Sequence, residues 1–362
     1  MNRRRAAILS AQTTRQQRGV SLIEFMVAML LGTILIGGAV TLYLASQRSF
    51  VKSERAGELA DNGRFALQLI NDTLRHAGFS GNVRPGIDFD ASSEATAPPG
   101  DCDDGASVMR PGDYLYAADP NDPSFVNCLD GADNAKGGTD VLVVKSLQAA
   151  PTYDANPVDP NDPGTSGAII DGVLDFPGPL DTAETTYIIA NAESGIMVDP
   201  TGTAPSVNDS YNPYFGGTAW PYQYQIFYVR DVSLPERPYP TLARKVLRWG
   251  GGTNEIGEPE DLVVGVEDVR YRFGWDSNGD GEVDTFGSHD DLAAGDWRRV
   301  LTVEAFVLVR SLDQDHNYQN DKSYTLGDEI FTPDGTDERK YHRLLVNSSI
   351  LLRNPQLRLG GS

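Results

Sequence analysis

The longest hydrophobic feature of the chain is an apolar run near its amino terminus. It extends from Val20 to about Ala45, and its central part, 22–44, would be about 34 Å long as a helix, enough to cross a bilayer. Residues 1–19 contain five arginines and no acid, so this leader is expected to stay cytoplasmic. The pattern predicts a single-pass membrane protein with a long extracytoplasmic remainder.

The helical pattern continues beyond the apolar run. Apolar or small residues recur at steps of three and four from Leu59 to Ala77, with charged residues between them. Gly78 and Gly81 then favour an end to the helix. Residues 46–80 therefore read as an amphipathic helix that packs on its own domain.

The rest of the chain alternates turn-rich stretches with short strand-like runs. Val269, Tyr271, Phe273 and Trp275 alternate with other residues, as in a half-buried strand. Further β-branched or aromatic runs predict strands at 141–144, 187–190, 222–229, 243–249, 300–310 and 344–353. A long helix followed by strands predicts an α+β fold with an antiparallel sheet and long loops in residues 81–362.

Charge and composition exclude some classes of function. The 30 basic and 51 acidic residues give a net charge of -21, which would repel the phosphates of nucleic acid. The chain has no nucleophile elbow, phosphate loop or zinc-binding histidine pair. We therefore expect a protein that is not an enzyme, with a hydrolytic head as the minor alternative.

The two cysteines, Cys102 and Cys128, lie in a stretch rich in Gly, Asp and Pro. Outside the cytoplasm a disulfide between them is favoured, and the loop-entropy model assigns it about 3 kcal/mol. Two free buried thiols are the alternative.

Glu24 is unexpected, because a carboxylate inside an apolar run is costly without a partner. The sequence from Arg18-Gly19 through Val20-Ser21-Leu22-Ile23-Glu24 resembles the type IV prepilin leader. The resemblance implies cleavage by the prepilin peptidase after Gly19, so that Val20 begins the mature chain and Glu24 is fifth. In that family the glutamate pairs with the amino terminus of a neighbouring subunit. The family usually begins with a methylated phenylalanine, and this chain has Val20 there, so methylation of Val20 stays an open expectation.

Other segments resemble the PilW class of minor pilins: 61–79, 261–269, 296–311 and 351–354. The resemblance implies a type IV pilin-like chain with a leader at 1–19, a transmembrane assembly helix at 20–45, an amphipathic helix at 46–80 and a periplasmic head at 81–362. It implies a minor pilin that primes pilus assembly and twitching motility near the tip. Expected partners are other minor pilins, the major pilin, a tip adhesin and the inner-membrane assembly platform. The location would be the inner membrane and then the pilus, in a Gram-negative bacterium.

Two other functions stay open. One is a minor pseudopilin of a type II secretion system, which has the same leader, helix and head as a minor pilin. The other is a calcium-dependent surface adhesin on a membrane anchor.

The segment 276–284 is the sharpest local chemical signal. Asp276, Asn278, Asp280, Glu282 and Asp284 occupy alternate positions, with Gly281 at the sixth. This spacing suits a calcium loop in which Glu282 supplies its backbone carbonyl. The twelfth position is Gly287, so Asp290, Asp291 or water would complete the shell. The alternative is an acidic turn without an ion. A weaker candidate, 313–321, has oxygens at the same offsets but lacks the glycine.

Overall fold

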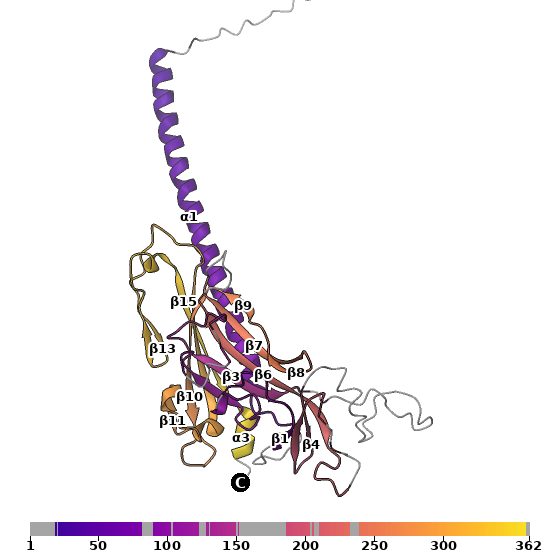
Figure 1. The fold of residues 1–362 in the computed structure, drawn as a ribbon. Coiled ribbons are helices and arrows are strands. Elements are labelled where there is room, and N and C mark those ends of the chain that lie inside the picture. The colour runs from indigo at the N-terminus through magenta and orange to yellow at the C-terminus, as the bar shows by residue number, and fades with distance from the viewer. Residues whose placement is uncertain are drawn as a thin grey trace, which may run out of the picture. The chain divides into compact units, whose positions relative to one another are not determined.

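The fold is described from a computed structural model of the full chain. The structure describes residues 19, 21–81, 90–102, 104–122, 128–129, 131–149, 151, 186–202, 205, 210–231 and 239–359. The chain divides into two compact units, Met1–Ala56 and Gly57–Ser362. One helix, α1 (Leu22–Leu74), runs through the boundary between them (Figure 1).

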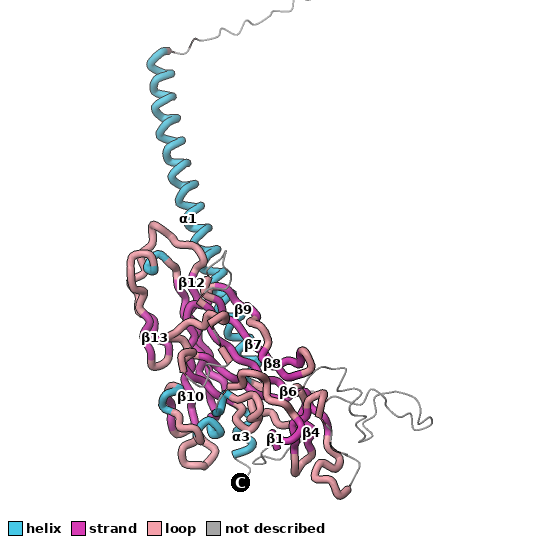
Figure 2. Tube along the Cα trace, in the orientation of Figure 1, coloured by secondary structure: helices cyan, strands magenta, loops and turns pink. Residues whose placement is uncertain are grey.

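Helix α1 precedes a series of strands and short helical turns (Figure 2). The strands are β1 (Asp90–Glu94), β2 (Leu115–Ala118), β3 (Val141–Leu147), β4 (Tyr187–Ala190), β5 (Gly195–Val198), β6 (Thr218–Arg230), β7 (Thr241–Gly250), β8 (Thr253–Ile256), β9 (Glu260–Val264), β10 (Val266–Trp275), β11 (Thr285–Gly287), β12 (Val300–Arg310), β13 (Tyr324–Leu326), β14 (Glu329–Phe331) and β15 (Arg343–Leu351). The helical turns are η1 (Asp104–Ala106), η3 (His289–Asp291), η4 (Asp296–Arg299) and η5 (Glu338–Lys340), and helix α3 (Arg353–Leu359) follows the last strand.

In the first unit, the described residues of α1 are almost entirely exposed. Leu22, Ile23, Leu35 and Leu42 each expose more than two thirds of their surface. Thr33 and Thr41 donate their hydroxyls to the backbone carbonyls three residues earlier, so their polar groups are satisfied within the helix. An exposed apolar surface with internally satisfied polar groups is what a lipid environment requires.

The second unit contains two large sheets. The first has nine strands, with β1-β5-β4-β6-β3-β2 in order and β7, β8 and β9 attached through β6 and β7. Strand β6 organises this sheet: Ile226 lies opposite Val143 on β3 and opposite Lys245 on β7. The pairings are antiparallel except that of β1 with β5. The α+β fold with an antiparallel β-rich head is confirmed.

The second sheet has the order β11-β10-β12-β15 and is antiparallel throughout. It begins where β9 passes into β10 through Gly265, which has φ +82°. A Cβ at this position would lie 2.8 Å from the carbonyl oxygen of Arg310. Only glycine fits this corner without strain, and the chain uses it to leave one sheet for the other.

One core joins the helix to both sheets. It includes Leu59, Ala66, Ile70 and Leu74 of α1, one face of β2, β3, β6 and β7, and the inward side chains of β10 and β12. The other face of the nine-stranded sheet forms a second core with the segments that carry the two cysteines. The amphipathic pattern of 46–80 thus corresponds to packing within Gly57–Ser362, where Leu59, Gly63 and Leu67 are buried.

Candidate functional site

The amino-terminal part of α1 carries the residues that the prepilin resemblance assigned. Gly19 lies just before the helix, exposed, with nothing within 4 Å of where a Cβ would be. Glu24 lies in the first helical turn, where the helix dipole favours a carboxylate. It is the only charged residue in the sequence between 22 and 44. Residues 1–18 of the leader, and Val20, lie outside the described residues.

Among the described residues, α1 is the one helix long and apolar enough to span a membrane, and the apolar window is unburied. The amide of Phe25 donates to the carbonyl of Ser21, and the helix begins at Leu22, three residues after Gly19. The predicted cleavage point after Gly19, the carboxylate of Glu24 and the apolar helix therefore lie within a few residues of one another along the sequence.

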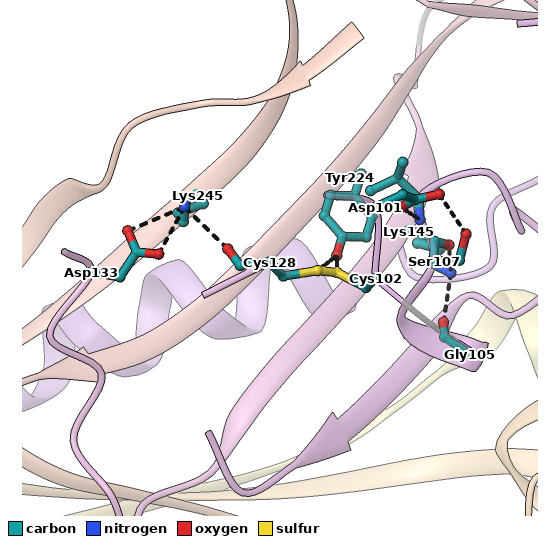
Figure 3. The surroundings of a disulfide bond; sticks show 10 residues. Asp101, Cys102, Gly105, Ser107, Cys128, Asp133, Lys145, Tyr224 and Lys245 are labelled. Carbon is teal, nitrogen blue, oxygen red and sulfur yellow. Dashed lines mark hydrogen bonds and ion pairs between the residues drawn. A yellow bond between two sulfur atoms is a disulfide. The ribbon is translucent and has the colours of Figure 1, made fainter. Parts of the chain in front are cut away.

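The predicted disulfide is present. Cys102 and Cys128 are bonded, with Cα atoms 5.4 Å apart, and both are buried against the second core (Figure 3). The Tyr224 hydroxyl lies 3.1 Å from the Cys102 sulfur. The bond therefore fixes the segment that covers this face of the nine-stranded sheet.

Two buried lysines hold the backbone on either side of the disulfide (Figure 3). Lys145 of β3 donates to the carbonyls of Gly105, Ser107 and Arg110 at 2.7, 2.5 and 3.1 Å. Burial lowers the pKa of Lys145 to about 7, although Asp113 and Asp101 raise it in part.

Lys245 of β7 holds the backbone on the other side of the disulfide. It donates to the Cys128 carbonyl at 3.1 Å and forms an ion pair with Asp133 at 2.9 Å. Neither lysine was predicted from the sequence to have this role. The signal for Lys145 was its position inside the apolar run of β3, where a charged residue requires a partner.

The segment 276–284 forms the loop of a hairpin between β10 and β11. Trp275 pairs with Thr285 across its base, and the amide of Asp276 donates to the Arg299 carbonyl. Gly279 and Gly281 have φ +90° and +84°, which explains why glycine is required at these two turns. The loop is thus built on the edge of the second sheet.

Inside this loop, one carboxylate organises the backbone. The buried Asp276 accepts hydrogen bonds from the amides of Asn278, Gly279 and Gly281. Burial opposes ionisation of Asp276, but these backbone hydrogen bonds lower the pKa of its carboxyl group below the usual value. Asp276 is therefore ionised at neutral pH.

The acidic side chains predicted as ligands are brought together in part. Oxygen atoms of Asp276, Asp280 and Asp284 all lie within 4.8 Å of one another. The side-chain amide of Asn278 donates to Asp280 and Asp284 at 3.2 and 3.0 Å, and the side chain of Glu282 is exposed. Three carboxylates around one point form a donor set suited to a hard divalent cation.

The acids proposed to complete this shell have other partners. Asp291 accepts the amide and hydroxyl of Ser288, and Asp290 lies 3.2 Å from His289. In the weaker candidate at 313–321, Asp315 lies 3.1 Å from His342. Across the described residues, the loop at 276–284 is the one group of carboxylates close enough to share an ion.

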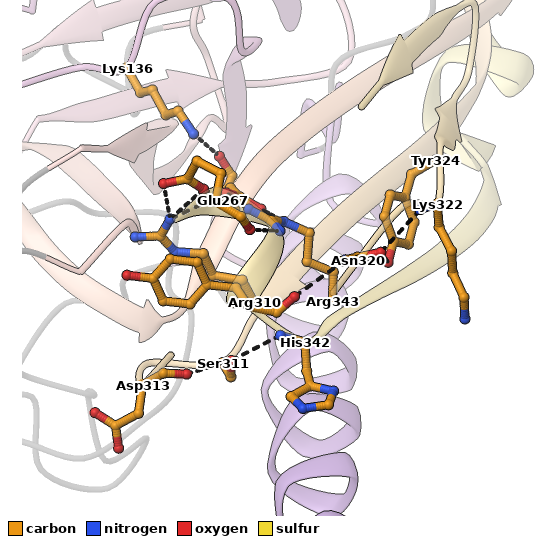
Figure 4. Close-up of polar contacts among 12 residues, drawn as sticks. Lys136, Glu267, Arg310, Ser311, Asp313, Asn320, Lys322, Tyr324, His342 and Arg343 are labelled. Carbon is orange, nitrogen blue, oxygen red and sulfur yellow. Dashed lines mark hydrogen bonds and ion pairs between the residues drawn. The ribbon is translucent and has the colours of Figure 1, made fainter. Parts of the chain in front are cut away.

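A buried ion-pair network, also missed from the sequence, joins the strands of the second sheet (Figure 4). Arg343 of β15 donates to both oxygens of Glu267 on β10, at 2.5 and 2.8 Å. Arg310 of β12 lies 3.4 Å from Glu267 and 3.2 Å from Glu338. Lys136 donates to the Glu267 carbonyl at 2.7 Å. The two arginines and the two glutamates each have a partner of opposite charge, and together they link β10, β12 and β15.

A long apolar amino-terminal helix and a β-rich α+β head define a membrane-anchored, pilin-like protein. Comparison with family models agrees: residues 14–40 match the prokaryotic N-terminal methylation motif, and residues 226–354 match type IV pilus-assembly protein W. Over these two segments the chain is similar to type IV pilus-related pilins and to the PilW assembly protein. No curated protein and no solved structure matches it.

Proposed function

We propose that this protein is a minor pilin that helps to prime type IV pilus assembly near the tip. The observation that carries the proposal is the combination of the methylation motif with the PilW match, which extends from β6 into α3. In this role the peptidase cuts after Gly19, and Glu24 pairs with the amino terminus of an adjacent subunit. The head has a structural role and not a catalytic one.

The proposed location and partners follow from this role. The basic leader lies in the cytoplasm, α1 crosses the inner membrane, and the head lies in the periplasm before entering the pilus. The partners are other minor pilins, the major pilin, a tip adhesin, the prepilin peptidase and the inner-membrane assembly platform. After cleavage Val20 is the residue that would be methylated.

The decisive experiment replaces Glu24 by Ala in the full-length chain, in cells that lack the wild-type copy. We expect fewer pili and loss of twitching while the protein stays in the membrane, because the carboxylate is the one charged group available to pair inside the apolar run. Amino-terminal sequencing of the wild-type protein should begin at Val20.

Asp72→Ala is the matched control, because Asp72 is an acidic residue of the same helix that lies far from the apolar run. It should leave pilus number unchanged. Normal pili and twitching in the Glu24→Ala strain would contradict the proposal. Normal pili together with impaired protein secretion would transfer the role to a type II secretion pseudopilin.

We further propose that the 276–284 loop binds calcium as a structural ion. The support is the convergence of three carboxylates on a hairpin loop whose backbone is already arranged by Asp276. The incomplete shell implies an affinity in the millimolar range. Its role is to turn the mutual repulsion of these carboxylates into a fixed loop.

A further inference from the structure

Two loop segments of the head, one before β13 and one after β14, are held together by their backbones. The amide of Asp315 donates to the carbonyl of Lys340 at 2.9 Å. The amide of Asn320 donates to the carbonyl of Arg339 at 2.7 Å. Because two backbone hydrogen bonds join the segments, the surface between them has a defined shape.

These two segments line a cavity of about 450 Å³. Its lining includes His316, Tyr318, Asp334, Thr336, Arg339 and Lys340. His316, Asp334 and Thr336 are exposed, so the cavity opens to solvent. The volume lies in the range of small-molecule sites, about 300–1,000 Å³.

One wall of the cavity is an aromatic ring in a fixed position. The ring of Tyr318 stacks on the imidazole of His342, with centroids 3.8 Å apart and an angle of 18° between the planes. The imidazole in turn lies 3.1 Å from the carboxylate of Asp315. Because the ring is already held, a ligand that packs against it loses little side-chain entropy on binding.

The other walls supply both hydrogen-bond donors and acceptors. The side chains of Asp334 and Thr336 form no hydrogen bond or ion pair within the part of the chain that the structure describes. In the same part of the chain, the Nε atom of Arg339 is buried and has no hydrogen-bond partner. A carboxylate accepts, a guanidinium donates and a hydroxyl does both, so the cavity suits a ligand with groups of both kinds.

The charges around the cavity argue against an ionic ligand. Lys340 forms an ion pair with Asp337 at 2.8 Å, and Arg339 lies 3.4 Å from Asp321. Both cations are therefore balanced, and the carboxylate of Asp334 would repel an anion. The same two cations oppose a cationic ligand. Asp334 also lies outside the one group of carboxylates, among the described residues, that is close enough to hold a metal ion. A neutral ligand fits best.

We propose that this cavity binds a neutral sugar and does so without calcium. A sugar combines hydroxyls, which donate and accept, with an apolar C–H face. The C–H face packs against Tyr318, the hydroxyls donate to Asp334, and Arg339 donates to a hydroxyl oxygen. The inference goes beyond the proposed pilin role, because it gives the head a recognition function of its own.

The test is saturation-transfer NMR of the full-length protein in a detergent without a sugar headgroup. The probes are glucose, galactose, mannose and N-acetylglucosamine, each titrated with calcium and with chelator. We expect binding of at least one probe, equal under both conditions. Asp334→Ala/Thr336→Val should weaken that binding by about tenfold, because two hydrogen bonds to the sugar are lost. Tyr318→Ala should weaken it as well, because the aromatic wall is removed.

Two matched controls should bind the probe as the wild type does. Glu193→Ala/Thr325→Val changes an exposed acid and an exposed threonine that do not line the cavity. Tyr211→Ala removes a tyrosine that is 96% exposed elsewhere in the head.

Four results would overturn the proposal. They are no binding of any probe, unchanged binding by Asp334→Ala/Thr336→Val, loss of binding in chelator, and tighter binding of glucuronate than of glucose. Loss in chelator would assign the sugar to the calcium loop, and a preference for glucuronate would assign the cavity to an anion. Because purified protein is tested and pili are not counted, these results are independent of the pilin role.

Discussion

Two buried lysines on one face of the nine-stranded sheet differ in the groups that receive their hydrogen bonds. Lys245 has a carboxylate partner, Asp133, whereas Lys145 donates to three backbone carbonyls. Burial without a carboxylate in contact disfavours the charged amine, and the pKa of Lys145 is lowered to about 7. The charge of Lys145 therefore changes near neutral pH, at a point that holds the disulfide-linked segment.

This difference predicts a pH dependence of stability. Between pH 7 and 9 the unfolded chain keeps Lys145 protonated while the folded chain releases the proton. The free energy of unfolding should therefore rise with pH, by at most about 1.4 kcal/mol per pH unit from this group. In Lys145→Met that contribution should vanish. The measurement is urea unfolding of the full-length chain in detergent, followed by the fluorescence of its tryptophans.

All 4 tryptophans (Trp220, Trp249, Trp275 and Trp297) lie in Gly57–Ser362, so the signal reports on this unit. Burial opposes protonation of His289, but its contacts with Asp140 raise the pKa of the imidazole above its usual value. The informative quantity is therefore the difference between wild type and variant. Lys245→Met is the matched control and should lower stability while keeping the wild-type slope. An unaltered slope in Lys145→Met would show that this amine does not titrate near neutral pH.

At the scale of elements, the packing of α1 on the second sheet depends on a glycine. A Cβ at Gly63 would lie 2.9 and 3.3 Å from the two methyl groups of Val346 on β15. At Gly57, two turns earlier in the same helix, nothing lies within 4 Å. The two glycines therefore have different roles although both lie in one helix.

The same substitution should have opposite effects at these two positions. Gly63→Leu should destabilise the protein by about 1–3 kcal/mol, because the side chain forces the helix away from β15. Gly57→Leu should be neutral or stabilising by up to about 1 kcal/mol, because it removes a poor helix former at an open position. Urea unfolding of both variants checks the pair, and equal stability of the two would contradict the packing argument.

Strand periodicity predicted the long elements well and the short ones poorly. The runs at 187–190 and 300–310 were predicted with the bounds that the structure has for β4 and β12. Strands β11, β13 and β14 have 3 residues each, too few to display a period. The division into two sheets depends on the φ of Gly265, which no alternation of residues reveals.

A candidate site could be predicted from the sequence where its residues lie close together along the chain. The disulfide was predicted from the only two cysteines in the sequence and is confirmed. The calcium loop, predicted from acidic residues at a fixed spacing, stays a prediction. Lys145 binds carbonyls 35–40 residues away, and the Glu267–Arg343 pair spans 76 residues. Such contacts depend on strand pairing, and carbonyl acceptors belong to every residue, so no sequence pattern identifies them.

At the scale of the whole molecule, a net charge of -21 means that acidic groups repel one another over the surface. The 276–284 loop concentrates this repulsion, because three of its carboxylates converge. The loop is also attached to the second sheet at both ends, through Asp276 to Arg299 and Asp284 to Trp275. Binding of an ion to the loop would therefore stabilise the fold that holds it.

Calcium should raise the melting temperature of the metal-stripped full-length protein. At a concentration ten times a millimolar dissociation constant, an ion that binds only the folded state adds about 1.4 kcal/mol. For a domain of this size that corresponds to a shift of about 2–5 °C. Asp280→Asn/Asp284→Asn should abolish the shift, whereas Glu193→Gln/Glu258→Gln, which removes two exposed acids elsewhere, should keep it. Equal melting curves with calcium and with chelator would refute the site, and an equal shift in the Asp280→Asn/Asp284→Asn variant would assign the effect of calcium to general screening of surface charge.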